Sequence, residues 1–115
     1  MTLNYGLIGC GMMGHEHLRN IALLEDAKIS VVFEPNPEMR ALAAQTLPQA
    51  VMVDSLKALL AHDPLDCLVI VSPNHCHMPQ LIEIAGQRAL PILCEKPLFI
   101  DPENFVLAQS FAQSY

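Results

Sequence analysis

The sequence has few basic residues, no long apolar run and no basic leader, and each absence excludes a class of protein. Six lysines and arginines stand against twelve aspartates and glutamates, which gives a net charge of −6. No basic cluster occurs, so we expect neither a nucleic-acid partner nor an anionic membrane partner. The apolar runs are short, as in Cys67–Val71, far below the length of a membrane span. With no signal peptide in view, the expected location is the cytoplasm.

Cysteine and metal-binding motifs are also scarce. The four cysteines form no Cys-x-x-Cys pair, and in a cytosolic α/β chain they are predicted to be free thiols: Cys10, Cys67, Cys76 and Cys94. Two histidine pairs, at residues 15 and 17 and at residues 75 and 77, have no metal-binding spacing. Histidines two apart on a helix point in different directions. We therefore predict no metal site.

What remains is an alternation of apolar segments and helix formers along a chain that is 52% hydrophobic and 16% charged. This balance is typical of one globular α/β domain. Strands are predicted at 3–8, 28–33, 51–53, 66–72 and 91–94, and helices at 14–24, 38–46, 55–60, 79–88 and from 102 onward. Such alternation indicates βαβ units in a doubly wound parallel sheet. The last helix should lead to a further strand, so we expect the domain 1–115 to be incomplete, truncated before that strand.

Three glycines follow the first strand in the pattern G-x-G-x-x-G: Gly9, Gly11 and Gly14. In a strand–turn–helix setting the first permits a tight turn, the second lets the backbone approach a pyrophosphate, and the third lets the helix pack closely on the sheet. The helix N-terminus adds free N–H groups for the phosphates. Between the glycines, Met12 and Met13 are predicted to shape this turn or to cover the cofactor pocket.

An acidic residue, Glu34, lies twenty residues beyond Gly14 at the end of the second strand. A carboxylate at this position hydrogen-bonds the ribose hydroxyls of a dinucleotide. It would repel a 2′-phosphate, so the predicted cofactor is NAD, with NADP less favoured. The competing interpretation is a structural glycine turn beside an ordinary surface glutamate.

Three further stretches carry a family resemblance: SPNHCH at residues 72–77, CEKPL at residues 94–98, and His17 three residues after Gly14. Together with the glycine motif, they resemble the N-terminal half of the Gfo/Idh/MocA oxidoreductases, over about residues 4–105. The resemblance implies a Rossmann-like domain in which the glycines line the pyrophosphate and Glu34 holds the adenosine ribose. It also implies a wall beside the diphosphate and the nicotinamide ribose, formed by Ser72, Pro73, Asn74 and His77.

The resemblance places Glu95 and Lys96 near the nicotinamide and the substrate, and implies a peptide bond before Pro97 that is often cis. Lys96 is the candidate catalytic residue, because a lysine desolvated beside a cofactor can polarise a hydroxyl or relay its proton. The alternative is a structural ion pair or a lysine at a helix start. His17 is interpreted as a packing or hydrogen-bonding residue.

The sequence departs from the family in several places. Ser72 stands for the usual threonine and Glu34 for the commoner aspartate, and the segment between Gly86 and Glu95 is about three residues longer. The C-terminal α/β domain that binds the substrate in the family is absent, so we expect this chain alone to be inactive.

The predicted function is that of an NAD(P)-binding domain of an oxidoreductase. The full enzyme would transfer a hydride between a nicotinamide cofactor and a sugar, polyol or related secondary alcohol or ketone. The alternative is a non-catalytic nucleotide-sensing or interaction module of the same fold. An open, apolar sheet edge would also favour a homo-oligomer.

Overall fold

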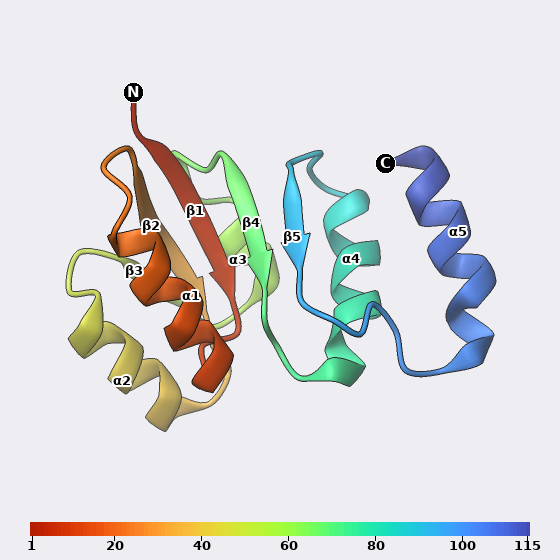
Figure 1. Cartoon of the computed structure of the whole chain (residues 1–115), viewed down its shortest axis with the longest axis horizontal. Helices are drawn as coiled ribbons and strands as arrows, with labels where there is room; N and C mark the ends of the chain where they lie inside the picture. Colours follow the sequence, from red (N-terminus) through yellow and green to blue (C-terminus); the bar gives the residue numbers. More distant parts are fainter.

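The computed structural model describes all of residues 1–115 and contains one five-stranded sheet (Figure 1). The strands are β1 (Leu3–Ile8), β2 (Ala27–Phe33), β3 (Val51–Val53), β4 (Cys67–Ile70) and β5 (Ile92–Cys94). Their order is β3-β2-β1-β4-β5, and every neighbouring pair is parallel. This order is the doubly wound arrangement that the alternation of elements predicts, so the predicted fold class is confirmed.

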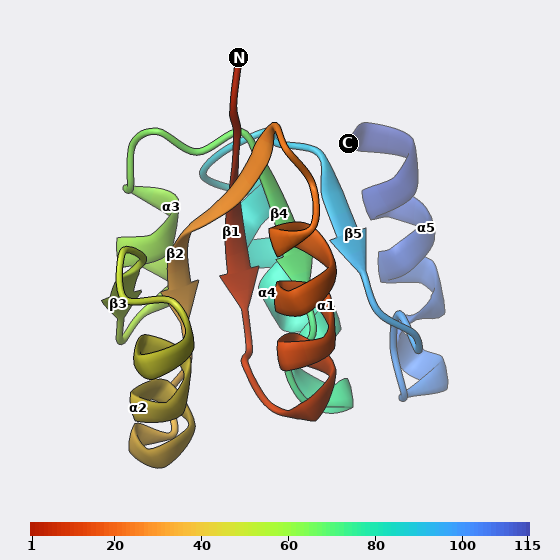
Figure 2. The same cartoon turned by 60° about the vertical axis from the view of Figure 1, so that its left-hand side comes forward.

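Helices cover both faces of the sheet, as the two views in Figures 1 and 2 show. They are α1 (Met12–Ala22), α2 (Pro37–Thr46), α3 (Leu56–Leu60), α4 (His77–Ala85) and α5 (Phe105–Ser114), with two short 3-10 turns, η1 (Asn74–Cys76) and η2 (Pro102–Asn104). α1 and α2 pack on one face, whereas α3, α4 and α5 contribute to the core on the other. Adjacent residues of a strand face opposite sides. Accordingly, Leu7 lies in one core cluster and Ile8 in the other.

Several helices start at other residues than predicted. α1 begins at Met12, directly after the glycine turn, two residues earlier than predicted. The chain makes the 3-10 turn η1 after β4, and α4 follows from His77. Asp101 does cap a turn, accepting from the Glu103 N–H, but this turn is the 3-10 element η2 and the helix itself starts at Phe105.

Backbone hydrogen bonds connect the segments that directly follow the strands at their carboxyl ends. The Gly9 N–H donates to the Phe33 carbonyl at 2.8 Å, the Val71 N–H to the Ile8 carbonyl at 2.8 Å, and the Glu95 N–H to the Ile70 carbonyl at 2.9 Å. These bonds keep the segments after β1, β2, β4 and β5 at one edge of the sheet. Ligands of open α/β sheets bind at this edge.

β5 forms one side of the sheet, and its outer edge has no partner strand. Leu93 on β5 is 57% exposed, and several apolar side chains of the segment that follows are exposed as well: Leu98, Ile100, Phe105, Val106 and Leu107. No helix in the chain has both the length and the apolar character needed to cross a bilayer.

Candidate functional site

The glycine turn is held in place by close backbone contacts. Gly9 has a φ of +90°, a conformation that glycine adopts without steric cost. A Cβ on Gly9 would lie 2.6 Å from the backbone N and Cα of Ser72, and one on Gly14 would lie 2.7 Å from the Gly9 carbonyl oxygen. The fold itself therefore requires glycine at both positions.

Gly11 differs from these two glycines. Its φ is −84°, and a Cβ there would meet nothing closer than the Met39 Sδ at 3.9 Å. The protein thus has space for a side chain at Gly11 and leaves it empty. Gly11 is also the N-cap of α1 and supplies no side-chain cap, so the first N–H groups of the helix are available to an anion. A cradle that a Cβ would fill, at an uncapped helix N-terminus, fits a pyrophosphate.

The methionines of the turn lie at the surface beside this cradle. Met12 and Met13 are both exposed, and their role in covering a cofactor pocket stays a prediction. The sequence did not single out Met39, the side chain nearest to the space beside Gly11.

Glu34 lies in the interior beside the glycine turn, so the alternative of an ordinary surface glutamate is wrong. Its side chain is 6% exposed. One carboxylate oxygen accepts from the Cys10 N–H at 2.8 Å, and the other accepts from the Asn36 N–H at 2.9 Å. The carboxylate therefore joins the turn after β1 to the turn after β2. Each oxygen can accept a second hydrogen bond, so capacity for a ribose hydroxyl remains.

The segment that follows β4 lies next to the glycine turn at the carboxyl edge of the sheet. Ser72 is buried and its hydroxyl donates to the Gln80 side chain, while its backbone packs against Gly9. Pro73 and Asn74 are exposed at the start of η1. These two residues can therefore contact a ligand at the edge.

His77, the fourth residue of the wall that the resemblance implies, lies in the interior. It is 1% exposed. Its Nε2 lies 2.8 Å from the Ser72 carbonyl oxygen, and its Nδ1 lies 2.7 Å from the Pro97 carbonyl oxygen. The 3-10 turn η1 precedes His77 and brings its ring between these two segments, so no ring nitrogen is free for a ligand.

Glu95 and Lys96 follow β5 at the same edge. The His17 Nε2 lies 2.8 Å from the Glu95 Oε1, which agrees with the hydrogen-bonding role predicted for His17. The hydrogen bond from His17 lowers the pKa of Glu95, with smaller contributions from the charges of His17 and Lys96. The Lys96–Pro97 peptide bond is cis, as the resemblance implied.

The Lys96 side chain is exposed and none of the ion pairs of the structure includes it. A structural ion pair is therefore not its role here. The desolvation expected of this lysine refers to a bound cofactor, so it stays a prediction. Lys96 follows β5 at the carboxyl edge of the sheet, and its side chain has no ion-pair partner.

The thiols and histidines form no metal site. All four cysteines are free, as predicted, and no group of three or more potential ligands occurs. Burial, with a smaller contribution from the charge of Glu34, raises the pKa of Cys10 to about 11. The Cys10 thiol is therefore protonated and unreactive at neutral pH.

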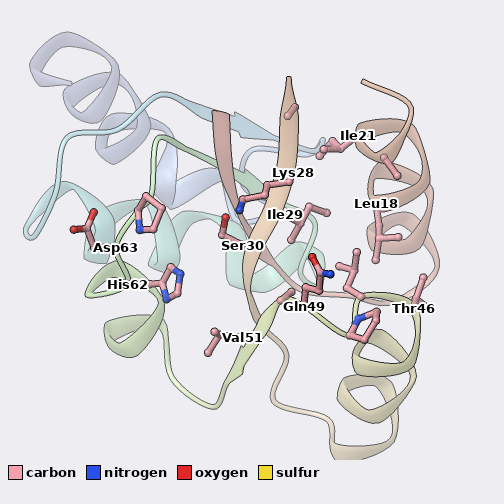
Figure 3. Close-up of a pocket in the computed structure, with 16 residues that line it drawn as sticks. Leu18, Ile21, Lys28, Ile29, Ser30, Thr46, Gln49, Val51, His62 and Asp63 are labelled. Carbon is pink, nitrogen blue, oxygen red and sulfur yellow. The ribbon is translucent and has the colours of Figure 1, made fainter. Parts of the chain in front are cut away.

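A separate hollow of about 550 Å³ lies at the opposite end of the sheet (Figure 3). It is lined by the start of β2, the end of α1 and the segments before β3 and β4, including Leu18, Ile29, Gln49 and His62. Because β2 starts at this hollow and ends at Phe33, next to Glu34, the hollow is separate from the glycine turn.

Comparison with known proteins agrees with this geometry. Residues 3–114 match the oxidoreductase family with an NAD-binding Rossmann fold, the GFO_IDH_MocA family. The chain belongs to this family, and its domain type is the NAD-binding Rossmann domain. The predicted cofactor, NAD, is the one that the family description names.

Particular relatives share the domain and extend well beyond it. Inositol 2-dehydrogenase of Corynebacterium glutamicum (strain R) is 36% identical over 104 residues, which cover 90% of this chain and 31% of that protein. The 2,7-anhydro-N-acetylneuraminate hydratase of Escherichia coli (strain K12) is 33% identical and is covered over 27% of its length. The chain therefore spans about a third of the length of these curated relatives or less.

One solved structure that shares the fold contains bound ligands. The scyllo-inositol dehydrogenase from Lactobacillus casei, with bound cofactor NAD(H) and scyllo-inositol, superposes with a TM-score of 0.85 at 29% identity. The match covers 98% of this chain and 34% of that one.

Proposed function

We propose that this chain binds NAD(H) at the carboxyl edge of its sheet and serves as the cofactor-binding part of an oxidoreductase. The observation that carries the proposal is Gly11, where the fold leaves open a space that a Cβ would fill, at the uncapped start of α1. Packing within the protein does not require glycine at position 11. The close approach of a ligand to the backbone would require it.

The residues around the cradle have distinct parts in this proposal. Gly9 and Gly14 set the turn, and the first N–H groups of α1 bind the pyrophosphate. Glu34 accepts from the ribose hydroxyls with the acceptor capacity that its two backbone contacts leave free. Pro73 and Asn74 line the side of the site toward the nicotinamide end.

Lys96 is the proposed catalytic residue. When bound, the nicotinamide cofactor supplies the acceptor or donor of a hydride. Oxidation of an alcohol also requires removal of the hydroxyl proton. The exposed Lys96 can accept this proton as a neutral amine, and the ammonium group so formed stabilises the developing alkoxide and passes the proton to water. The substrate class that we propose is a sugar, a polyol or a related secondary alcohol or ketone, in line with the inositol dehydrogenases among the relatives.

The alternative, a non-catalytic nucleotide-sensing module, uses the same glycine cradle but has no need of Lys96. The exposed and unpaired Lys96 side chain favours the oxidoreductase. Substrate binding and turnover belong to the full-length protein in this proposal, with residues beyond those of this domain. The free thiols are in keeping with the reducing cytoplasm, which stays a prediction.

The test is a calorimetric titration of the purified chain with NADH and with NADPH. We expect saturable NADH binding and weaker NADPH binding, because the Glu34 carboxylate repels a 2′-phosphate. Glu34→Gln, which keeps the size of the side chain and removes its charge, should reduce the preference by about tenfold, or about 1.4 kcal/mol. Glu38→Gln, on the exposed first turn of α2, is the matched control.

Circular dichroism of each variant shows whether it is folded before affinities are compared. If the folded wild-type chain binds neither nucleotide, the proposal is wrong. If it binds both equally well and Glu34→Gln changes nothing, the dinucleotide site stands but the assigned role of Glu34 does not.

A further inference from the structure

We propose that His17 and His77 act together as positioning residues that hold the Glu95–Pro97 segment from both faces of the sheet and so fix Lys96 at the nucleotide edge. The inference rests on the proposed function, because it assigns Lys96 to the nicotinamide end of the site. The motif residues alone do not show this pairing. It follows from contacts that the fold makes between helices and the end of β5.

The first contact comes from the helix that starts at the glycine turn. His17 lies on α1, and its Nε2 is 2.8 Å from the Glu95 Oε1. The side chains of His17 and Glu95 are 20% and 29% exposed, so the bond is partly shielded from water. Because α1 begins at Met12, this bond joins the pyrophosphate turn to the residue before Lys96.

The second contact comes from the other face. His77 starts α4, and its ring lies between the Ser72 carbonyl oxygen at 2.8 Å and the Pro97 carbonyl oxygen at 2.7 Å. A carbonyl oxygen only accepts hydrogen bonds, and a neutral imidazole carries one N–H, so in each tautomer the ring donates to one of these two carbonyl oxygens. His77 therefore joins the segment after β4 to the residue that follows Lys96.

The Glu95–Pro97 segment needs side-chain contacts because the strand before it, β5, makes few backbone hydrogen bonds to the sheet. It has three residues and pairs only with β4. Beyond β5, one backbone bond, from the Glu95 N–H to the Ile70 carbonyl, holds the segment to the sheet. α1 and α4 lie on opposite faces of the sheet (Figure 2). The residues on either side of Lys96 are thus held from two directions, while the Lys96 side chain stays free for a ligand.

The experiment compares NADH with ADP-ribose, which lacks the nicotinamide. His17→Phe keeps a ring but removes the hydrogen bond to Glu95. It should weaken NADH binding about fivefold to tenfold and leave ADP-ribose binding within about twofold. His17→Gln keeps a donor and should restore much of the NADH affinity. His62→Phe, in the hollow at the opposite end of the sheet, is the control. His77→Phe is measured as well, provided that circular dichroism shows it folded.

A double-mutant cycle with Lys96→Met tests whether His17 acts through Lys96. If it does, His17→Phe adds little to the loss that Lys96→Met already causes. Equal losses for NADH and ADP-ribose, or full additivity with Lys96→Met, would overturn the inference while the dinucleotide site stands. Failure of the wild-type chain to bind either ligand would overturn the proposed function and this inference with it.

Discussion

The glycine turn and the Glu95–Pro97 segment lie at the same edge of the sheet, but the protein holds them in different ways. The turn is fixed by backbone contacts, since a Cβ on Gly9 or Gly14 would overlap main-chain atoms. The Glu95–Pro97 segment follows the edge strand β5 and depends on the side chains of His17 and His77. Backbone contacts thus fix the glycine turn, whereas side-chain hydrogen bonds hold the Glu95–Pro97 segment.

The strands behind these two regions show the same contrast. β1 lies between two neighbours in the centre of the sheet, and its Leu7 and Ile8 are fully buried. β5 has one neighbour and an exposed Leu93. Substitutions of equal size in the two regions should therefore have very different consequences.

The largest effect is expected for Gly9→Ala. The added methyl group would lie 2.6 Å from the Ser72 backbone, at a φ of +90°. Strain and overpacking together should cost roughly 4 kcal/mol of the free energy of unfolding, measured by urea denaturation. Gly86→Ala is the control, since Gly86 has a φ of −77° and the nearest atom to its added Cβ, the Glu83 carbonyl oxygen, lies at 3.6 Å, an ordinary contact. A Gly9→Ala variant as stable as the control would contradict the account of the turn.

A pair of leucine substitutions compares the central strand with the edge strand. Leu7→Ala removes a fully buried side chain and should cost about 3 kcal/mol. Leu93→Ala removes a side chain that is 57% exposed and should cost about 0.5 kcal/mol. The difference between the two urea midpoints is the measurement. Similar losses would mean that the outer side of β5 is covered in solution.

Alkaline pH should weaken the fold through the thiols. The pKa of Cys10 rises from 9.0 to about 11 on folding, and burial also raises the pKa of Cys67 and Cys94. Above pH 9.0 the unfolded chain loses thiol protons that the folded chain keeps, so the unfolded state binds fewer protons. The free energy of unfolding must therefore fall as the pH rises through this window.

Urea denaturation at about pH 8 and about pH 10.5 measures this decline. Cys10→Ala should make it shallower, whereas Cys76→Ala, which removes a thiol outside the core, should leave it unchanged. An equal decline in both variants would show that Cys10 is not among the groups responsible.

The sequence carried enough information for the fold and for the glycine turn. Both are local signals: apolar strands alternate with helices, and three glycines follow a strand. The contacts of Glu34 with Cys10, of His17 with Glu95 and of His77 with Pro97 span 24, 78 and 20 residues. No local pattern reports such contacts, because tertiary packing brings the partners together.

Gly6, within β1, is a second case in which contacts between residues far apart in the sequence decide the residue type. A Cβ there would meet the side chains of Leu59, Leu65 and Leu68 at 2.9 to 3.2 Å. This glycine lets the segment around α3 pack onto β1, a requirement that depends on residues more than fifty positions away. The sequence predicts the start of α4 at residue 79, whereas the helix begins at His77. The 3-10 turn that precedes it has no distinct sequence signature.

The most direct test of the central claim compares Gly11→Ala with the wild-type chain in two measurements, urea denaturation and calorimetric titration with NADH. The account predicts that the stability of Gly11→Ala stays within about 1 kcal/mol of wild type, because its Cβ has room and surface substitutions without a buried clash cost little. It predicts that NADH affinity falls at least about tenfold, because the Cβ occupies the space that the pyrophosphate needs. Unchanged NADH affinity in the folded variant would contradict the claim that the dinucleotide binds against Gly11.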